Sequence, residues 1–150
     1  MRAISGKGRL ARAGALLGAF ALGIAGTSLV MQASADEKGE AGTVTPAFAY
    51  DLPNLPGQTI TGVLVEYPPG ASTPPHHHTE KGSVVAYVLE GAIRSKVNEG
   101  PERVYQAGES WQEPPGAAHS VSENASTSEP ARLLAVFVAE SGAELTTFDE

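Results

Sequence analysis

The sequence predicts an all-β sandwich or barrel. Short segments rich in Val, Ile, Thr and Tyr recur along residues 36–150, and turn-forming residues separate them at intervals of about eight to twelve residues. No segment of this region has a sustained helical period, and only the tail after Glu140 is ambiguous. The region also contains no internal repeat, so we expect one barrel rather than a tandem pair.

The elements follow one another in a simple order. Residues 36–57 are polar and rich in Gly and Pro, which predicts a flexible N-terminal segment with a short edge strand near 43–50. The strands expected after it are 58–67, 83–89, 92–97, 103–106, 110–113, 119–122 and 131–139. The segment 83–89 has little polar face, so we expect it to be buried on both faces. The barrel is assigned to 58–140 and a C-terminal tail to 141–150.

Residues 1–35 have the pattern of a secretory signal peptide. Four basic residues lie within the first twelve positions, residues 13–35 carry no charge, and the apolar run closes with Ala33-Ser34-Ala35. The small-x-small end predicts cleavage before Asp36 and a periplasmic or secreted protein with no stable membrane association afterwards. The alternative is an uncleaved N-terminal helix that anchors the protein to a membrane, because an uncharged run of this length can span a bilayer.

Charge and composition narrow the function. The whole chain has 10 Lys and Arg against 17 Asp and Glu. Without the leader, 6 basic residues remain, and the net charge becomes −11. Such a surface repels the phosphate backbone, so we expect no nucleic-acid partner. The chain has no cysteine, which excludes disulfides, thiol nucleophiles and thiolate ligands and leaves imidazole, carboxylate, carbonyl or water as metal ligands.

The four histidines lie in two segments punctuated by Gly and Pro. His76, His77 and His78 follow Pro74-Pro75, and His119 follows Pro114-Pro115-Gly116. On a strand, side chains alternate between faces, so His76 and His78 project to one side and His77 to the other. We expect the barrel to bring the two segments together, so that His76, His78 and His119 bind one metal ion.

These two segments resemble the two conserved motifs of the cupin family. Gly70-x5-His76-x-His78, ending in Gly91, is similar to the first motif, and Gly108-x5-Pro114-x-Gly116-x2-His119-x4-Asn124 is similar to the second. The resemblance implies a single-domain, cupin-like jelly-roll barrel that follows the signal segment. It also implies a divalent transition metal (Fe, Mn, Ni, Cu, Co or Zn) and a homodimer that binds a small-molecule ligand or substrate.

The chain departs from the family pattern at two positions. The family carries a glutamate seven residues before the glycine of the turn, and counting back from Gly91 gives Val84, which cannot ligate a metal. In the second motif, Asn124 lies one residue later than the pattern expects. Glu80 is the nearest carboxylate to the position of the missing glutamate. Glu80 lies in the loop after His78, where it either folds back as a ligand or is a solvated loop charge.

Glu113, directly before Pro114, is the candidate catalytic residue. If it faces inward, its carboxylate could act as acid or base or support a ligand; the alternative is an outward, solvated position. His77 is a further candidate for the missing ligand, although strand alternation turns it away. Trp111 and Tyr87 are interpreted as side chains that fill the barrel.

The sequence therefore predicts an exported metal-binding cupin-domain protein. If it is an enzyme, the resemblance implies metal-dependent dioxygenase, lyase or isomerase chemistry on a small organic molecule. The alternatives are a non-catalytic periplasmic module that binds a small ligand or a metal, and a degenerate barrel with vestigial histidines.

Overall fold

The computed structural model describes residues 41–149, and the predicted signal segment lies outside them. The described residues form β-strands, turns and loops with no helix, as the sequence predicts, and hence none that could cross a membrane. The strands are β1 (Thr43–Asp51), β2 (Gln58–Tyr67), β3 (Ser72–Thr73), β4 (His76–His78), β5 (Gly82–Glu90), β6 (Ala92–Val97), β7 (Arg103–Gln106), β8 (Ser110–Glu113), β9 (Ala118–Asn124), β10 (Ala131–Glu140) and β11 (Thr146–Phe148).

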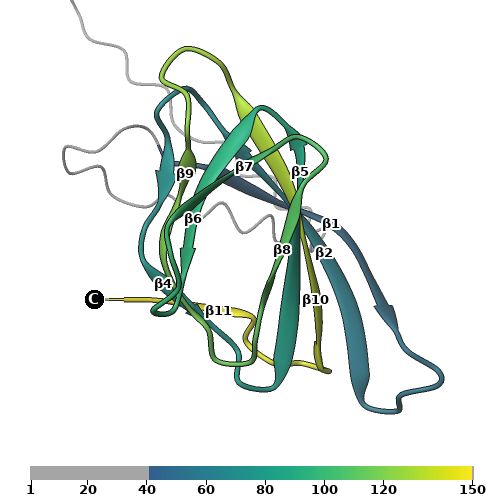
Figure 1. The fold of residues 1–150 in the computed structure, drawn as a ribbon. Coiled ribbons are helices and arrows are strands. Elements are labelled where there is room, and N and C mark those ends of the chain that lie inside the picture. The colour runs from purple at the N-terminus through teal and green to yellow at the C-terminus, as the bar shows by residue number, and fades with distance from the viewer. Residues whose placement is uncertain (1–40, 150) are drawn as a thin grey trace, which may run out of the picture.

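The strands form two antiparallel sheets that face each other (Figure 1). One sheet has the order β1-β2-β10-β5-β8, and the other has the order β11-β4-β9-β6-β7, with the short β3 also paired to β9. Neighbours in the sheets are far apart in the sequence: β10 lies between β2 and β5. This arrangement places β4 and β9 in one sheet and β8 in the other, so residues from both predicted motifs can meet between the sheets.

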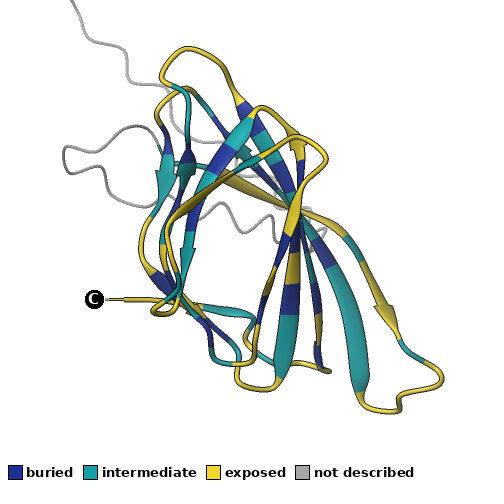
Figure 2. Cartoon of the chain, viewed as in Figure 1, coloured by how far each residue is buried: buried dark blue, intermediate teal, exposed yellow. Residues whose placement is uncertain are grey.

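The interior is built by strict alternation along the long strands. On β10 the inward residues are buried and the intervening ones are more exposed, as the bands in Figure 2 show. The buried set on this strand is Ala131, Leu133, Ala135, Phe137 and Ala139. The larger of these side chains pack with Val65, Val88 and Ile93 in one apolar cluster. Burial of each large apolar side chain contributes about 1.5–3 kcal/mol, so this cluster supplies the main driving force for closing the two sheets.

The prediction for the strand 83–89 was wrong. Val84, Ala86 and Val88 of β5 are buried, but Val85, Tyr87 and Leu89 are 42–45% exposed on the outer face. Tyr87 therefore does not fill the barrel. An apolar run without polar alternation was interpreted as burial on both faces, whereas only the inward face of β5 is covered.

The two ends of the described region add strands to the sheets. The edge strand predicted near 43–50 is present as β1, which pairs with β2 at the border of its sheet. The tail after Glu140, which the sequence left ambiguous, contributes β11. β11 pairs with β4 in the register Thr146↔His78 and Phe148↔His76. The C-terminal tail therefore lies directly beside the histidine strand.

Candidate metal centre

β4 orients its three histidines as strand alternation predicts. His76 and His78 are buried, whereas His77 is exposed and contacts Asp149 through Nδ1 at 2.7 Å. The strand is only three residues long because Pro74 and Pro75 precede it and a turn follows. Its position between β9 and β11 directs the two inward imidazoles into the space between the sheets.

A β-bulge in β9 places His119 beside them. His119 pairs with His76 across β4 and β9, and the rings of these two residues lie 5.0 Å apart between centroids. On the β6 side, Lys96 pairs with Val121 but Val97 pairs with His119, so β9 holds one extra residue at this point. Such a bulge shifts the inward face by one position. Both His119 and Asn124 are therefore buried although one position is odd and the other even. The bulge accounts for the late position of Asn124.

Glu113 enters the same space from the opposite sheet. It lies on β8, faces inward, and is 2% exposed. Its Oε2 is 3.0 Å from His78 Nε2, and its Oε1 is 3.4 Å from His119 Nδ1. The indole N–H of Trp111 donates a hydrogen bond of 2.8 Å to Oε1. The structure thus resolves the two alternatives for the orientation of Glu113 in favour of the interior.

Backbone and side-chain oxygens hold the outer nitrogens of the rings. His76 Nδ1 is 2.8 Å from the carbonyl of Pro74, and His78 Nδ1 is 3.2 Å from the carbonyl of Leu145. A carbonyl only accepts hydrogen bonds, so each contact requires the proton on Nδ1, and in that tautomer Nε2 presents a lone pair to the interior. On β6, the hydroxyl of Ser95 lies 2.8 Å from His119 Nε2 and can accept its proton, which leaves the lone pair on Nδ1. Such outer contacts fix the orientation of metal-binding imidazoles.

Burial sets the protonation of the cluster. It lowers the pKa of His119 to about 4 and also lowers the pKa of His76, because a charged imidazole loses its hydration there. Burial by itself raises the pKa of Glu113, but the contacts with His78 and His119 and the Trp111 N–H outweigh it, so the net pKa lies below the usual value. At neutral pH, His76 and His119 are neutral ligands beside a carboxylate, a donor set that attracts a cation.

The geometry fits a transition-metal ion. One ligand atom from each of His76, His78 and His119 can be chosen so that all three lie within 4.8 Å of one another. Ligands about 2.1 Å from an ion are about 3.0 Å apart when adjacent and about 4.2 Å apart when opposite, so small side-chain adjustments bring all three to bonding distance. Glu80, by contrast, is exposed, and its side chain lies next to the backbone of Gly116 rather than in the cluster.

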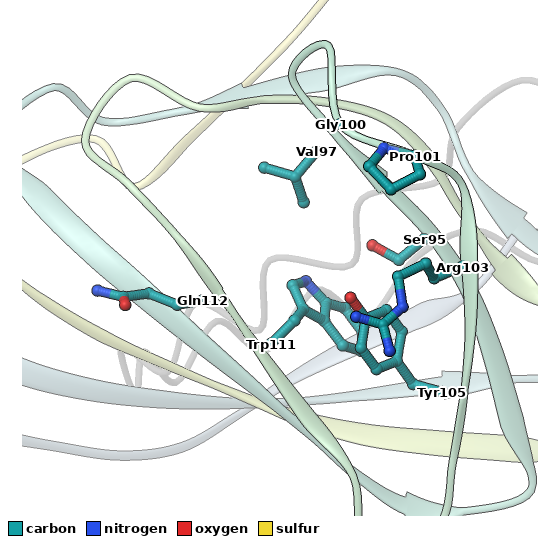
Figure 3. Close-up of a pocket in the computed structure, with 8 residues that line it drawn as sticks. All are labelled: Ser95, Val97, Gly100, Pro101, Arg103, Tyr105, Trp111 and Gln112. Atoms are coloured by element: carbon teal, nitrogen blue, oxygen red, sulfur yellow. The ribbon is translucent and has the colours of Figure 1, made fainter.

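Figure 3 shows a cavity of about 200 Å³ whose lining includes Ser95 and Trp111. These two residues contact His119 and Glu113 of the cluster. Trp111 and Tyr105 form one side, with ring centroids 4.6 Å apart, and the guanidinium of Arg103 lies 5.1 Å from the centre of the Tyr105 ring. Ser95 lies in its wall and contacts His119. The full lining is Ser95, Val97, Gly100, Pro101, Arg103, Tyr105, Trp111 and Gln112.

Sequence reasoning missed most of this cavity. Ser95 had one usable signal, since it is a polar residue at an inward position between Ile93 and Val97. Arg103 and Tyr105 lie on a short strand with no distinguishing pattern. Trp111, predicted to fill the barrel, is buried and also holds the Glu113 carboxylate.

Comparisons with solved structures support the same architecture. TT1209 from Thermus thermophilus is similar, with 29% identity and a TM-score of 0.52 over 71% of this chain and 90% of that protein. A recombinant oxalate oxidase in complex with glycolate has 21% identity and a TM-score of 0.57, covering 81% of this chain and 62% of its own. The DMSP lyase DddQ from Ruegeria pomeroyi DSS-3 has 19% identity and a TM-score of 0.50, covering 59% and 42%. At these identities the oxidase and the lyase show the fold alone.

The family itself is identified from the sequence. A comparison with curated protein sequences finds no significant match. The family described as "Cupin domain", however, matches residues 63–137, which is half of the chain and includes both histidine segments. This match, the facing antiparallel sheets and the three buried histidines lead to one conclusion: the chain belongs to the cupin family.

Proposed function

We propose that this protein binds a divalent transition metal through His76, His78 and His119 and acts there on a small organic molecule. The observation that supports it is the arrangement of the three imidazoles. They are buried, and their outer nitrogens contact Pro74, Leu145 and Ser95. A histidine that only filled the core would not need its inner nitrogen directed at two other imidazoles.

The adjoining cavity supports a small-molecule ligand. It places two aromatic rings and the Arg103 guanidinium next to Ser95, which contacts His119. A metal bound by three protein nitrogens keeps positions open for a substrate or dioxygen and polarises what binds there. The aromatic rings would orient an apolar part of the molecule, and Arg103 would attract an anionic group. The reaction class remains dioxygenase, lyase or isomerase, as the cupin resemblance implies.

Metal content tests this proposal. Protein purified without a histidine tag should contain close to one transition-metal ion per chain by inductively coupled plasma mass spectrometry. His76→Ala and His119→Ala should each lose it, whereas His77→Ala, which removes an exposed imidazole, should retain it. Absence of stoichiometric metal from the wild-type protein after incubation with Mn²⁺, Fe²⁺, Co²⁺, Ni²⁺, Cu²⁺ and Zn²⁺ would sink the proposal.

A second measurement separates an enzyme from a non-catalytic binding module. Metal-loaded protein is incubated with flavonols, catechols, 2-hydroxynitriles and sugar acids while oxygen uptake and product formation are followed. Turnover that disappears in His119→Ala supports the enzyme. Binding by calorimetry without turnover supports the module.

Export and dimer formation are further parts of the proposal, and both rest on the sequence. Asp36 should be the first residue of the mature protein recovered from the periplasm or the medium, and a membrane-bound chain that begins near Met1 would contradict cleavage. Light scattering should give twice the mass of the mature chain.

A further inference from the structure

Glu113 places a buried charge in the centre of the molecule without completing its hydrogen bonds. The side chain is 2% exposed, and Oε1 accepts the indole N–H of Trp111 at 2.8 Å. No hydrogen-bond donor for Oε2 exists among residues 41–149. A buried carboxylate that lacks part of its hydrogen bonding is destabilising unless another positive partner compensates for the lost hydration.

The imidazole of His78, which contacts Oε2, does not supply that partner. His78 Nε2 lies 3.0 Å away, but the contact lacks the geometry of a hydrogen bond. His78 Nδ1 lies 3.2 Å from both the carbonyl of Leu145 and the hydroxyl of Thr146. When Nδ1 carries the proton and donates it to the carbonyl, Nε2 and Oε2 present lone pairs to each other across 3.0 Å, an arrangement that a cation between them would stabilise. The spacing equals that of adjacent ligands on one ion, about 3.0 Å for bonds of about 2.1 Å.

We propose that Glu113 is the fourth protein ligand of the metal, which it binds through Oε2 together with His76, His78 and His119. The inference rests on the proposed function, because it presupposes the metal. It assigns Glu113 to holding the ion rather than to moving protons. Trp111 is then a positioning residue, since its N–H fixes Oε1 and thereby aims Oε2 at the ion.

The sheet register explains how a carboxylate from β8 reaches this place. Glu113 pairs directly with Val84 of β5, and residues opposite each other on antiparallel strands project to the same face with Cβ atoms about 5 Å apart. Val84 is 1% exposed and faces the interior. A side chain at position 113 can therefore reach the same part of the interior between the sheets as a side chain at position 84. In this chain the neighbouring strand supplies the carboxylate that β5 lacks.

This relation predicts that the carboxylate can be exchanged between the two strands. The variants are Glu113→Gln, which keeps the shape and removes the charge, Glu113→Val, and the double exchange Val84→Glu with Glu113→Val. Glu80→Gln is the matched control, because it makes the same substitution at an exposed position. Each protein is stripped of metal and titrated with Mn²⁺ and Zn²⁺ by competition calorimetry, and the absorption spectrum of the Co²⁺ form is recorded.

Glu113→Gln and Glu113→Val should each weaken metal binding by about 10-fold or more and alter the Co²⁺ spectrum, whereas Glu80→Gln should do neither. The double exchange should recover most of the lost affinity. Wild-type affinity and an unchanged Co²⁺ spectrum in Glu113→Gln would overturn the assignment while leaving the three-histidine site intact. Failure of the wild-type protein to bind any metal would instead refute the proposed function.

A direct measurement does not depend on the variants being folded. In a crystal structure of the wild-type protein grown with Zn²⁺, the distance from Oε2 to the metal should be about 2.0–2.2 Å. A distance beyond about 3 Å, with water between the carboxylate and the ion, would make Glu113 an outer residue and overturn the proposal.

Discussion

β9 carries two groups of buried polar residues that differ in how completely they are hydrogen-bonded. At its start, His119 belongs to the cluster with Glu113, in which Oε2 has no donor among the described residues. Farther along, Ser122 accepts or donates a hydrogen bond with Tyr67, whose hydroxyl also contacts Thr73 at 2.6 Å. The amide of Asn124 donates to the carbonyls of Tyr67, Pro68 and Glu129 and accepts from the backbone of Ser126.

The two groups of buried polar residues therefore have different roles in the protein. The group around Tyr67 and Asn124 is closed: its polar atoms contact one another and the backbone, which stabilises the turn after β2 and the loop before β10. The group around Glu113 is open, because Oε2 of Glu113 has no hydrogen-bond partner among the described residues. An open group lowers the stability of the metal-free protein, and it is kept where a ligand completes it. Substitutions in the two groups should therefore have different consequences.

The largest effect is expected from acidification of the metal-free protein. The pKa of His119 is about 4 in the folded state against 6.5 normally, so the unfolded state binds more protons between these values. Stability should be complete above about pH 6.5 and fall by about 3 kcal/mol as the pH approaches 4. The lowered pKa of Glu113 acts in the same direction at the acid end. Urea unfolding with a chelator, at several pH values between neutral and the folded-state pKa of His119, measures this loss.

The control for this prediction is His119→Gln, which should show a shallower dependence on pH, whereas His77→Gln should keep the wild-type slope. Parallel curves for the wild type and His119→Gln would mean that His119 has the same pKa in the folded and unfolded states.

Asn124→Ala should have the next largest effect, in the closed group. The carbonyls of Tyr67, Pro68 and Glu129 lose their side-chain donor, and the Ser126 N–H loses its acceptor. We expect a loss of about 2–3 kcal/mol in the free energy of unfolding, with metal affinity changed less than about twofold. Chemical denaturation and metal titration of the same variant check both. Loss of metal binding without loss of stability would show that the two groups are not separate.

Tyr67→Phe removes two hydrogen bonds from the closed group while keeping the ring in the core. The hydroxyls of Thr73 and Ser122 lose a partner, so the protein should be less stable by about 1–2 kcal/mol. Metal affinity should again be unchanged. The double variant Tyr67→Phe with Ser122→Ala serves as a comparison: if the hydrogen bond matters, the two losses should not add.

The smallest effect on stability is expected from a substitution of His77. This residue lies between His76 and His78 in the sequence but on the outer face of β4. Its contact with Asp149 is exposed, so His77→Ala should change stability by less than about 0.5 kcal/mol. Metal binding should be unchanged. A weakened metal site in this variant would indicate that β4 does not keep its alternation once the ion is bound.

A site residue could be predicted from the sequence where the pattern that marks it lies within one short segment of the chain. The convergence of His76, His78 and His119 could be predicted because each of these residues lies in one of two short segments with a recognisable motif. Glu113 was found as a candidate, but its orientation was open, because one residue before a proline does not define the face of a strand. The relation between Glu113 and Val84 depends on the pairing of β5 with β8, which no linear pattern contains.

The same distinction explains the fold. The strand positions follow from β-branched runs and turn residues, so the all-β architecture was predicted correctly. The bulge in β9 changes which residues of the strand face inward. Its one sign in the sequence was Asn124, which lies one residue later than the cupin motif expects. The exposure of Tyr87 was predicted wrongly because an apolar strand does not reveal whether one or both of its faces are covered. The strand β11 has three residues, too few for a periodic signal.

The position of β11 has a consequence for the order in which the protein matures. The carbonyl that contacts His78 Nδ1 belongs to Leu145, which lies 67 residues further along the chain. A growing chain can form the other strands earlier, but it cannot make this contact until residue 145 has been synthesised. If the chain is exported in an extended form, the ion is acquired only after transport is complete. The metal is then selected by the compartment in which the protein folds, rather than by the one in which it is made.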